Sequence, residues 1–151
     1  TIDSGRAVLS SNFLEFCANV RKNDPSILPE PGQPLRIRDD LSGKEDIELA
    51  DALLESTSVT YLLLDYAKNF TKSSAEAMAK YVRTSKHLQQ IDWRKGDSGR
   101  ELNRRQEIIC CFLHAIQESA SLEELRMELP PIGGPSNLAF GNMLANTQSL
   151  R

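Results

Sequence analysis

Apolar residues recur along this chain first at the spacing of a helix and then at the spacing of a strand. Residues 50–64 read A-x-x-L, five further residues, and then V-x-x-L-x-L. The same order returns at 79–93, which is 29 residues further along. A third copy occupies 113–127, 34 residues after the second, and a fourth begins at Gly141. Self-similarity at this period predicts a solenoid of helix–strand units, each of which buries its apolar face against its neighbours.

The alternation of apolar and polar residues in the strand motifs predicts the register of a sheet. Leu62, Ile91 and Leu125 hold the same place in successive copies, so we expect them to be neighbours in one parallel sheet backed by helices. Residues 35–37 alternate in the same way and supply an earlier strand. Helical spacing predicts helices over 4–22, 44–56, 74–85, 99–119 and 136–146.

Two further features recur in the predicted helices. In the pattern S-x-x-E at a helix start, the serine hydroxyl accepts a free backbone N–H and the glutamate returns a bond. The three instances are Ser42 with Glu45, Ser73 with Glu76, and Ser98 with Glu101. One equivalent position is apolar in every unit and should form a continuous buried row. Its residues are Leu49, Met78, Phe112 and Phe140.

A proline-rich stretch divides the chain into two parts. Residues 1–34 contain the first helix and a linker with prolines at 25, 29, 31 and 34, which exclude both a helix interior and a central strand. This part is either a cap on the first repeat or a degenerate first unit. Residues 35–151 hold about four units. The last of them stops within its strand motif, so we expect a truncated array that belongs to a longer protein.

The repeated frame resembles the leucine-rich repeat family, in particular its ribonuclease-inhibitor-like class, over residues 35–150. The resemblance implies an α/β solenoid with a short parallel strand layer on the concave side and helices on the convex side. It also implies that the concave surface binds other proteins. The asparagine that the family places in the turn after the strand is missing, so these turns must be built otherwise. The residues in its place are Asp40, Ala67, Gly96 and Pro130.

A second resemblance concerns the same units. Residues 50–59 and 142–147 are similar to the repeat domain of tropomodulin, a family that also has irregular repeats without the turn asparagine. This resemblance implies an actin-regulating domain as an alternative function.

Composition limits the classes of function. The chain is 40% hydrophobic and 26% charged with a net charge of −3, which predicts a soluble globular protein and gives no basic excess to attract nucleic acid. No apolar run approaches the roughly 18–20 residues of a membrane span, so we expect no membrane insertion. Three cysteines without framework spacing predict reduced thiols and an intracellular, cytoplasmic protein.

The strand motifs also predict which residues meet a partner. If Leu62 and Leu64 face the core, Tyr61 and Leu63 face the opposite side of the sheet. Applied to every strand, this geometry predicts the partner-binding residues Arg36, Arg38, Tyr61, Leu63, Asp65, Gln90, Asp92, Arg94, Glu124, Arg126 and Glu128. In one interpretation the charges only pair across strands. In the other, Tyr61 and Leu63 anchor a protein partner within a polar rim.

No constellation of residues in the sequence favours catalysis. Cys110 and Cys111 share a helical face with His114, but a zinc site normally needs four ligands, and buried packing is the simpler interpretation. Residues 96–99 lack the lysine of a phosphate-binding loop. Phe70, beyond a strand, is interpreted as tucked under the next helix. We therefore predict a non-enzymatic protein-interaction module with no cofactor and no metal. The alternatives are a structural subunit of a larger assembly or a supporting domain of a longer protein.

Overall fold

Helices and strands alternate along the chain. The structure, a computed structural model, describes residues 10–30, 32–37, 41–65, 70–94 and 106–127. The elements in order are α1 (Ser11–Arg21), β1 (Leu35–Arg36), α2 (Gly43–Glu55), β2 (Tyr61–Asp65), α3 (Lys72–Thr84), β3 (Gln90–Arg94), α4 (Gln106–Glu118) and β4 (Glu124–Met127). Each described strand follows the helix of its own unit, which is the order that the repeat predicts.

The described strands form one parallel sheet in the order of the chain. β1 pairs with β2, β2 with β3 and β3 with β4. Leu62 pairs with Ile91, and Ile91 pairs with Leu125, so the predicted register is confirmed. A parallel pair needs a connection that returns the chain to the same end of the sheet. The helices α2, α3 and α4 supply these connections.

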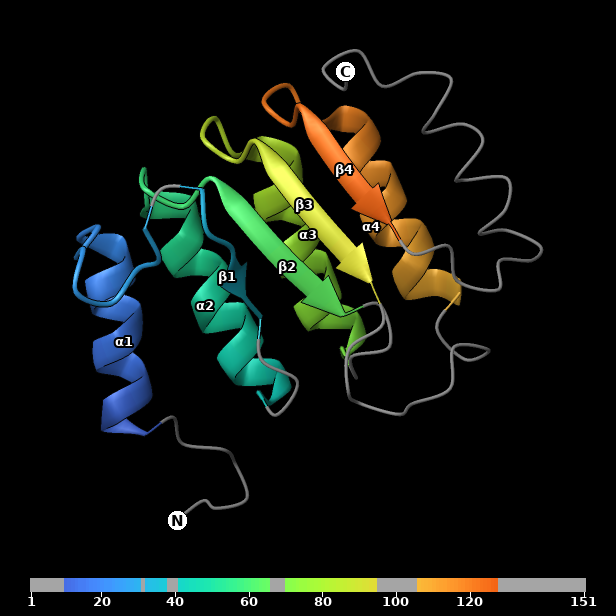
Figure 1. Cartoon of the computed structure of the whole chain (residues 1–151). Helices are drawn as coiled ribbons and strands as arrows, with labels where there is room; N and C mark the ends of the chain where they lie inside the picture. The colour runs from blue at the N-terminus through green and yellow to red at the C-terminus, as the bar shows by residue number, and fades with distance from the viewer. Residues whose placement is uncertain (1–9, 31, 38–40, 66–69, 95–105, 128–151) are drawn as a thin grey trace.

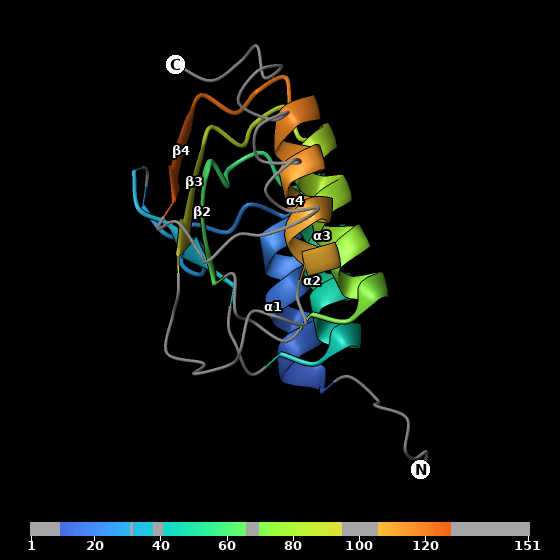
Figure 2. The same ribbon diagram turned by 90° about the vertical axis from the view of Figure 1, so that its right-hand side faces the viewer.

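The described helices all cover the same face of the sheet (Figure 1). Seen from the side, the strands make one layer and the helices a second (Figure 2). α2 packs against α1 and α3, and α3 also packs against α4. The predicted α/β fold, with a parallel strand layer and a helix layer, is confirmed. The opposite face of the sheet has no covering helix among the described residues.

The core lies between the two layers. Leu62 and Ile91 are fully buried, and the ring centroid of Trp93 lies 5.9 Å from that of Phe112. Phe70 is 4% exposed, so its predicted burial is confirmed, and its ring packs at 5.3 Å against Phe112 of α4, one helix beyond the helix that directly follows it. Aromatic pairs at this separation stabilise a core beyond the area they bury. Of the predicted apolar row, Leu49, Met78 and Phe112 are buried, and Phe140 lies outside the described residues.

α1 occupies the first position in the helix layer. Its predicted range, 4–22, is wrong at Ser10, which has an extended backbone and accepts the N–H of Phe13 on its hydroxyl at 3.1 Å. An N-cap of this kind has non-helical torsions, so the helix begins after it. At the other end, the Arg21 guanidinium donates to Glu48 and Glu55 of α2 at 2.8 Å each. α1 and β1 therefore hold the helix and strand positions beside α2 and β2.

The starts of α2 and α3 use different residues for the same cap. Ser42 and Glu45 form the predicted box: the hydroxyl accepts the Glu45 N–H at 3.2 Å, and the carboxylate accepts the Ser42 N–H at 2.8 Å. The box predicted at Ser73 is wrong, because the cap is Thr71, whose hydroxyl accepts the N–H of Ser74 at 3.0 Å. Ser73 is already inside the helix. The box predicted at 98–101 lies outside the described residues.

The first turns of α2 and α3 approach each other closely. A Cβ atom at Gly43 would lie 3.0 Å from Cγ2 and 3.1 Å from Oγ1 of Thr71. A side chain at residue 43 would therefore press on the threonine that caps the next helix. Glycine allows the two units to stack without displacing that cap.

Replacing Thr71 with Ala should lower the free energy of unfolding by about 0.5–2 kcal/mol, because one N–H of the first turn loses its acceptor. Ser73→Ala is the matched control, since Ser73 is exposed and only two residues from Thr71, and it should stay within about 0.5 kcal/mol of the parent. Urea unfolding followed by circular dichroism measures both. Equal losses in the two variants would contradict the assignment of the cap.

The turns from helix to strand are built around a repeated serine. These residues are Ser56, Ser85 and Ser119, which follow α2, α3 and α4. Their hydroxyl oxygens accept the backbone N–H of Ser58 at 3.3 Å, of Leu88 at 3.0 Å and of Leu122 at 3.1 Å. The strand and helix patterns do not predict this serine, although its spacings are those of the repeat. It does for these turns what a side-chain cap does at a helix start.

Asn23 joins the end of α1 to the turn between α2 and β2. Its φ of 58° lies in the left-handed region, which asparagine tolerates better than most residues. Its Oδ1 accepts the Ser56 hydroxyl at 2.8 Å, the Thr57 N–H at 2.8 Å and the Ser58 N–H at 3.0 Å. One side chain therefore satisfies three donors of the neighbouring unit.

Candidate functional site

The candidate site is the face of the sheet that points away from the helices, here called the open face. Leu62, Leu64, Ile91 and Trp93 are buried under the helices, so the alternate residues of each strand lie on the open face. Its described side chains are Arg36, Tyr61, Leu63, Gln90, Asp92, Glu124 and Arg126. Of the other predicted partner-binding residues, Arg38 and Glu128 lie outside the described residues.

The parallel register brings the predicted residues into rows across the strands. Arg36 pairs with Leu63, Leu63 with Asp92, and Asp92 with Arg126, which makes one central row. A second row joins Tyr61, Gln90 and Glu124, and in a third Asp65 pairs with Arg94. Sequence alternation alone was sufficient to predict these rows.

Exposure varies along the central row more than alternation predicts. Arg36 and Arg126 at its ends are exposed, Leu63 is half-buried, and Asp92 is only 6% exposed. The prediction that Asp92 lies exposed on this face is therefore wrong. Its neighbours in the row are the larger side chains of Leu63 and Arg126, and Tyr61 reaches it from the next row.

A short hydrogen bond connects Tyr61 to Asp92. The Tyr61 hydroxyl donates to Oδ2 of Asp92 at 2.6 Å. A bond to a charged acceptor is stronger than one between neutral groups. Tyr61 is half-buried, so its ring is partly available while its polar end is engaged. This hydrogen bond fixes the Tyr61 hydroxyl on the open face. Strand alternation predicts Tyr61 as an anchor for a partner, but it does not predict this bond.

The outer strand of the open face carries an ion pair. Nε of Arg126 donates to Oε2 of Glu124 at 2.7 Å, and the side chains are 66% and 48% exposed. The pKa of the Arg126 guanidinium is raised, first by this hydrogen bond and then by the charges of Glu124 and Asp92. Two carboxylates thus favour the charged guanidinium, Glu124 in its own strand through direct contact and Asp92 in the neighbouring strand through its charge. The open face has both signs of charge around a partly apolar centre.

The cysteines show packing and not ligand geometry. Cys17 is buried, and burial, followed by the nearby charge of Glu48, raises the pKa of its thiol to about 11. Burial also raises the pKa of Cys111, which lies half-buried on α4. His114 is exposed. Within the described ranges, no three His, Cys, Asp or Glu side chains come together as metal ligands.

No helix in the described part of the chain is long and apolar enough to cross a membrane. This finding agrees with the absence of a long apolar run in the sequence.

Fold and site together define the class of domain: a two-layer α/β domain of repeated helix–strand units, with a parallel sheet whose second side is uncovered in the part of the chain that the structure describes. A solved structure with this arrangement is actin-binding site 2 of leiomodin-1, which is 18% identical to this chain with a TM-score of 0.65. The match covers 94% of this chain and 78% of the leiomodin-1 chain. At this identity the likeness shows a shared fold.

A further similar structure is the tropomodulin C-terminal domain of Caenorhabditis elegans, at 14% identity and a TM-score of 0.47. That match covers 91% of this chain and 93% of the other. No protein-family model matches the sequence, and no curated protein matches it at significant similarity. The likeness to the leiomodin-1 structure concerns the fold and does not single out the ribonuclease-inhibitor-like class.

Proposed function

We propose that this chain is a non-enzymatic protein-interaction module of the leucine-rich-repeat type, in which the open face is the concave side of a solenoid and binds a protein partner. The support is the combination of a partly apolar centre, Tyr61 and Leu63, with charges around it. Protein interfaces combine an aromatic or apolar centre with a polar rim in this way. Because the sheet is already ordered, binding does not cost the free energy of ordering this surface.

The partner that we propose first is actin. The observation that carries this proposal is the likeness to actin-binding site 2 of leiomodin-1 over 94% of the chain. Folds are shared by domains with different functions, so the likeness selects a partner to test. Binding to actin would place the protein in the cytoplasm, as its reduced cysteines also favour.

The test measures binding of the intact chain to purified monomeric actin, by fluorescence anisotropy, and to filamentous actin, by co-sedimentation. We expect saturable binding to at least one form. Binding to neither form at concentrations up to about 100 μM, which corresponds to roughly 5.5 kcal/mol, would exclude actin as a partner.

A paired charge reversal tests whether the open face is the contact. Arg36→Glu with Arg126→Glu places two negative charges at the ends of the central row, and it should weaken partner binding by about tenfold or more. The matched control, Lys44→Glu with Lys80→Glu, changes the net charge equally on the exposed sides of α2 and α3 and should leave the affinity within about twofold. If the control loses as much affinity as the open-face variant, the open face is not the binding surface.

A further inference from the structure

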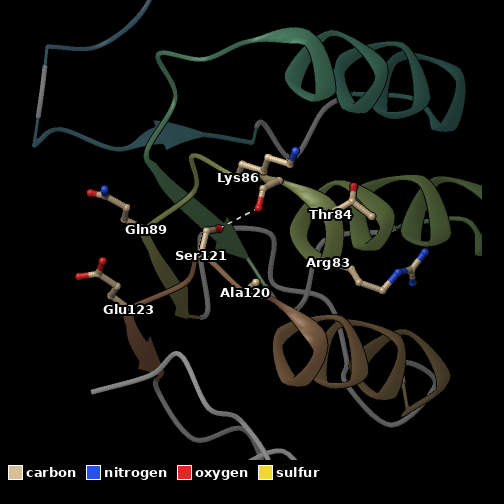
Figure 3. A pocket seen from close by; sticks show the side chains of 8 residues that line it. Arg83, Thr84, Lys86, Gln89, Ala120, Ser121 and Glu123 are labelled. Carbon is tan, nitrogen blue, oxygen red and sulfur yellow. Dashed lines mark hydrogen bonds between the residues drawn. The ribbon is translucent and has the colours of Figure 1, made fainter.

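A polar pocket lies away from the central row, between two successive helix-to-strand turns. It has a volume of about 600 Å³, within the range of about 300–1,000 Å³ that small ligands and peptide side chains occupy. The turn from α3 to β3 forms one wall and the turn from α4 to β4 the other (Figure 3). Its lining residues are Arg83, Thr84, Ser85, Lys86, Gln89, Ala120, Ser121 and Glu123.

Hydrogen bonds between the turns hold the floor of the pocket. The Ser121 hydroxyl lies 2.9 Å from the carbonyl oxygen of Ser85, the bond drawn in Figure 3, and 2.7 Å from the carbonyl oxygen of Leu88; either oxygen can accept its proton. The backbone N–H of Glu123 donates to the carbonyl of Gln89 at 2.8 Å. These bonds join residues of two different units. The shape of the pocket therefore exists before a ligand enters, which lowers the cost of binding.

Two cations project from the α3 side of the pocket. The Arg83 side chain is 42% exposed, and its Nε lies 4.0 Å from Glu118, too far for a hydrogen bond. Lys86 is exposed, and its ammonium has no hydrogen-bond or ion-pair partner within the described ranges. Glu123 lies on the other wall, away from Arg83 (Figure 3). In a chain of net charge −3, this pocket has two cations and one carboxylate.

The remaining polar groups favour an acceptor as the ligand. The Thr84 hydroxyl donates its proton to the Lys80 carbonyl at 2.7 Å, and the Ser121 hydroxyl donates its proton to a backbone carbonyl at the floor of the pocket. The charged donors in the lining are thus the guanidinium of Arg83, which faces Glu118 at 4.0 Å, and the ammonium of Lys86, while the amide of Gln89 is a neutral donor. A guanidinium can bind a carboxylate through two parallel N–H···O bonds, and an ammonium binds a carboxylate as a point charge.

We propose that this pocket binds the carboxylates of a short acidic segment of a protein partner, with Arg83 and Lys86 as the donors. Glu123 on the opposite wall limits the acidic stretch to one or two residues, because a longer one would bring like charges together. This site is separate from the central row of the open face. The proposal for the pocket can therefore be tested independently of actin binding to the open face.

The probe is a labelled peptide with two adjacent glutamates between glycines and serines, compared with the same peptide carrying glutamines. Fluorescence anisotropy with the intact chain should show saturable binding of the glutamate peptide only. In amide NMR spectra, the shifted resonances should belong to 83–89 and 120–123. Arg83→Gln with Lys86→Gln should weaken binding by about tenfold or more, since two charge-assisted contacts are lost. The control, Lys72→Gln with Lys80→Gln, removes the same charge from α3 outside the pocket and should change the affinity by less than about twofold.

Lys86 also provides a variant that leaves the helix unchanged. It lies after Ser85, the C-cap of α3, so Lys86→Gln alone should weaken peptide binding by a few-fold while the melting temperature stays the same. Equal binding of the glutamine peptide, an equal loss in the Lys72 and Lys80 control, or shifted resonances outside the pocket would each overturn the proposal. Absence of binding at millimolar peptide would overturn it as well.

Discussion

Replacing Asn23 with Ala should lower the free energy of unfolding by about 2–4 kcal/mol. The Ser56 hydroxyl and the Thr57 N–H lose their acceptor, at a net cost of about 0.5–1.5 kcal/mol each, while the Ser58 N–H keeps its second acceptor, the Ser56 hydroxyl. Alanine at a φ of 58° adds roughly 1 kcal/mol of backbone strain. Urea unfolding can be followed by the fluorescence of Trp93, which is the only tryptophan of the chain and is 2% exposed.

Two substitutions at the same position separate these causes. Asn23→Asp keeps both an acceptor oxygen and a residue that tolerates positive φ, so it should stay within about 1 kcal/mol of the parent. Asn23→Gly relieves the strain and loses the acceptor, so it should be more stable than the Ala variant by about 1 kcal/mol. An Ala variant as stable as the parent would show that Asn23 does not hold α1 to the next unit.

The second large effect is expected in the core. Leu53 on α2 is 1% exposed, and Leu53→Ala should cost about 2–5 kcal/mol through lost burial and the cavity left behind. Leu54 is the neighbouring residue with the same side chain, but it is 37% exposed. Leu54→Ala should therefore cost less than about 1 kcal/mol. Chemical denaturation measures both, and similar losses for the two leucines would contradict the assigned faces of α2.

The two proposed binding sites depend on different parts of the structure. The open face depends on side chains that the sheet register aligns, such as Arg36 and Arg126. The pocket depends on two turns that the Ser121 hydroxyl connects. Because their charge variants lie on different elements, a loss of binding in one pair with retention in the other assigns each ligand to its site.

The sequence is sufficient to predict the rows of the open face, but it does not predict how deeply each side chain in a row is buried. Side-chain alternation has a period of two in any strand, so the row of Leu63, Asp92 and Arg126 follows from the repeat alone. How deep Asp92 lies depends on the sizes and directions of side chains from three strands. Alternation contains no such information, and Asp92 was therefore predicted as exposed.

The helix starts show the same limit on a local scale. The S-x-x-E pattern occurs at both Ser42 and Ser73, but only Ser42 is a cap. The pattern states that a residue can cap a helix, and it does not state where the helix begins. At α3 the cap is two residues earlier, at Thr71, which also lies against Gly43 of the preceding unit. Of the two residues that could cap α3, the one that does so, Thr71, is thus also the one that contacts the preceding unit.

By itself, the sequence determined the alternation of helix and strand, the parallel register and the apolar positions of the core. These follow from periodicity, because a helix and a strand each repeat their side-chain direction at a fixed spacing. Only the tertiary structure decided the roles of Asn23 and Asp92 and the pocket between the turns of α3 and α4. Each of these joins atoms from different units, and their distances depend on how the units stack.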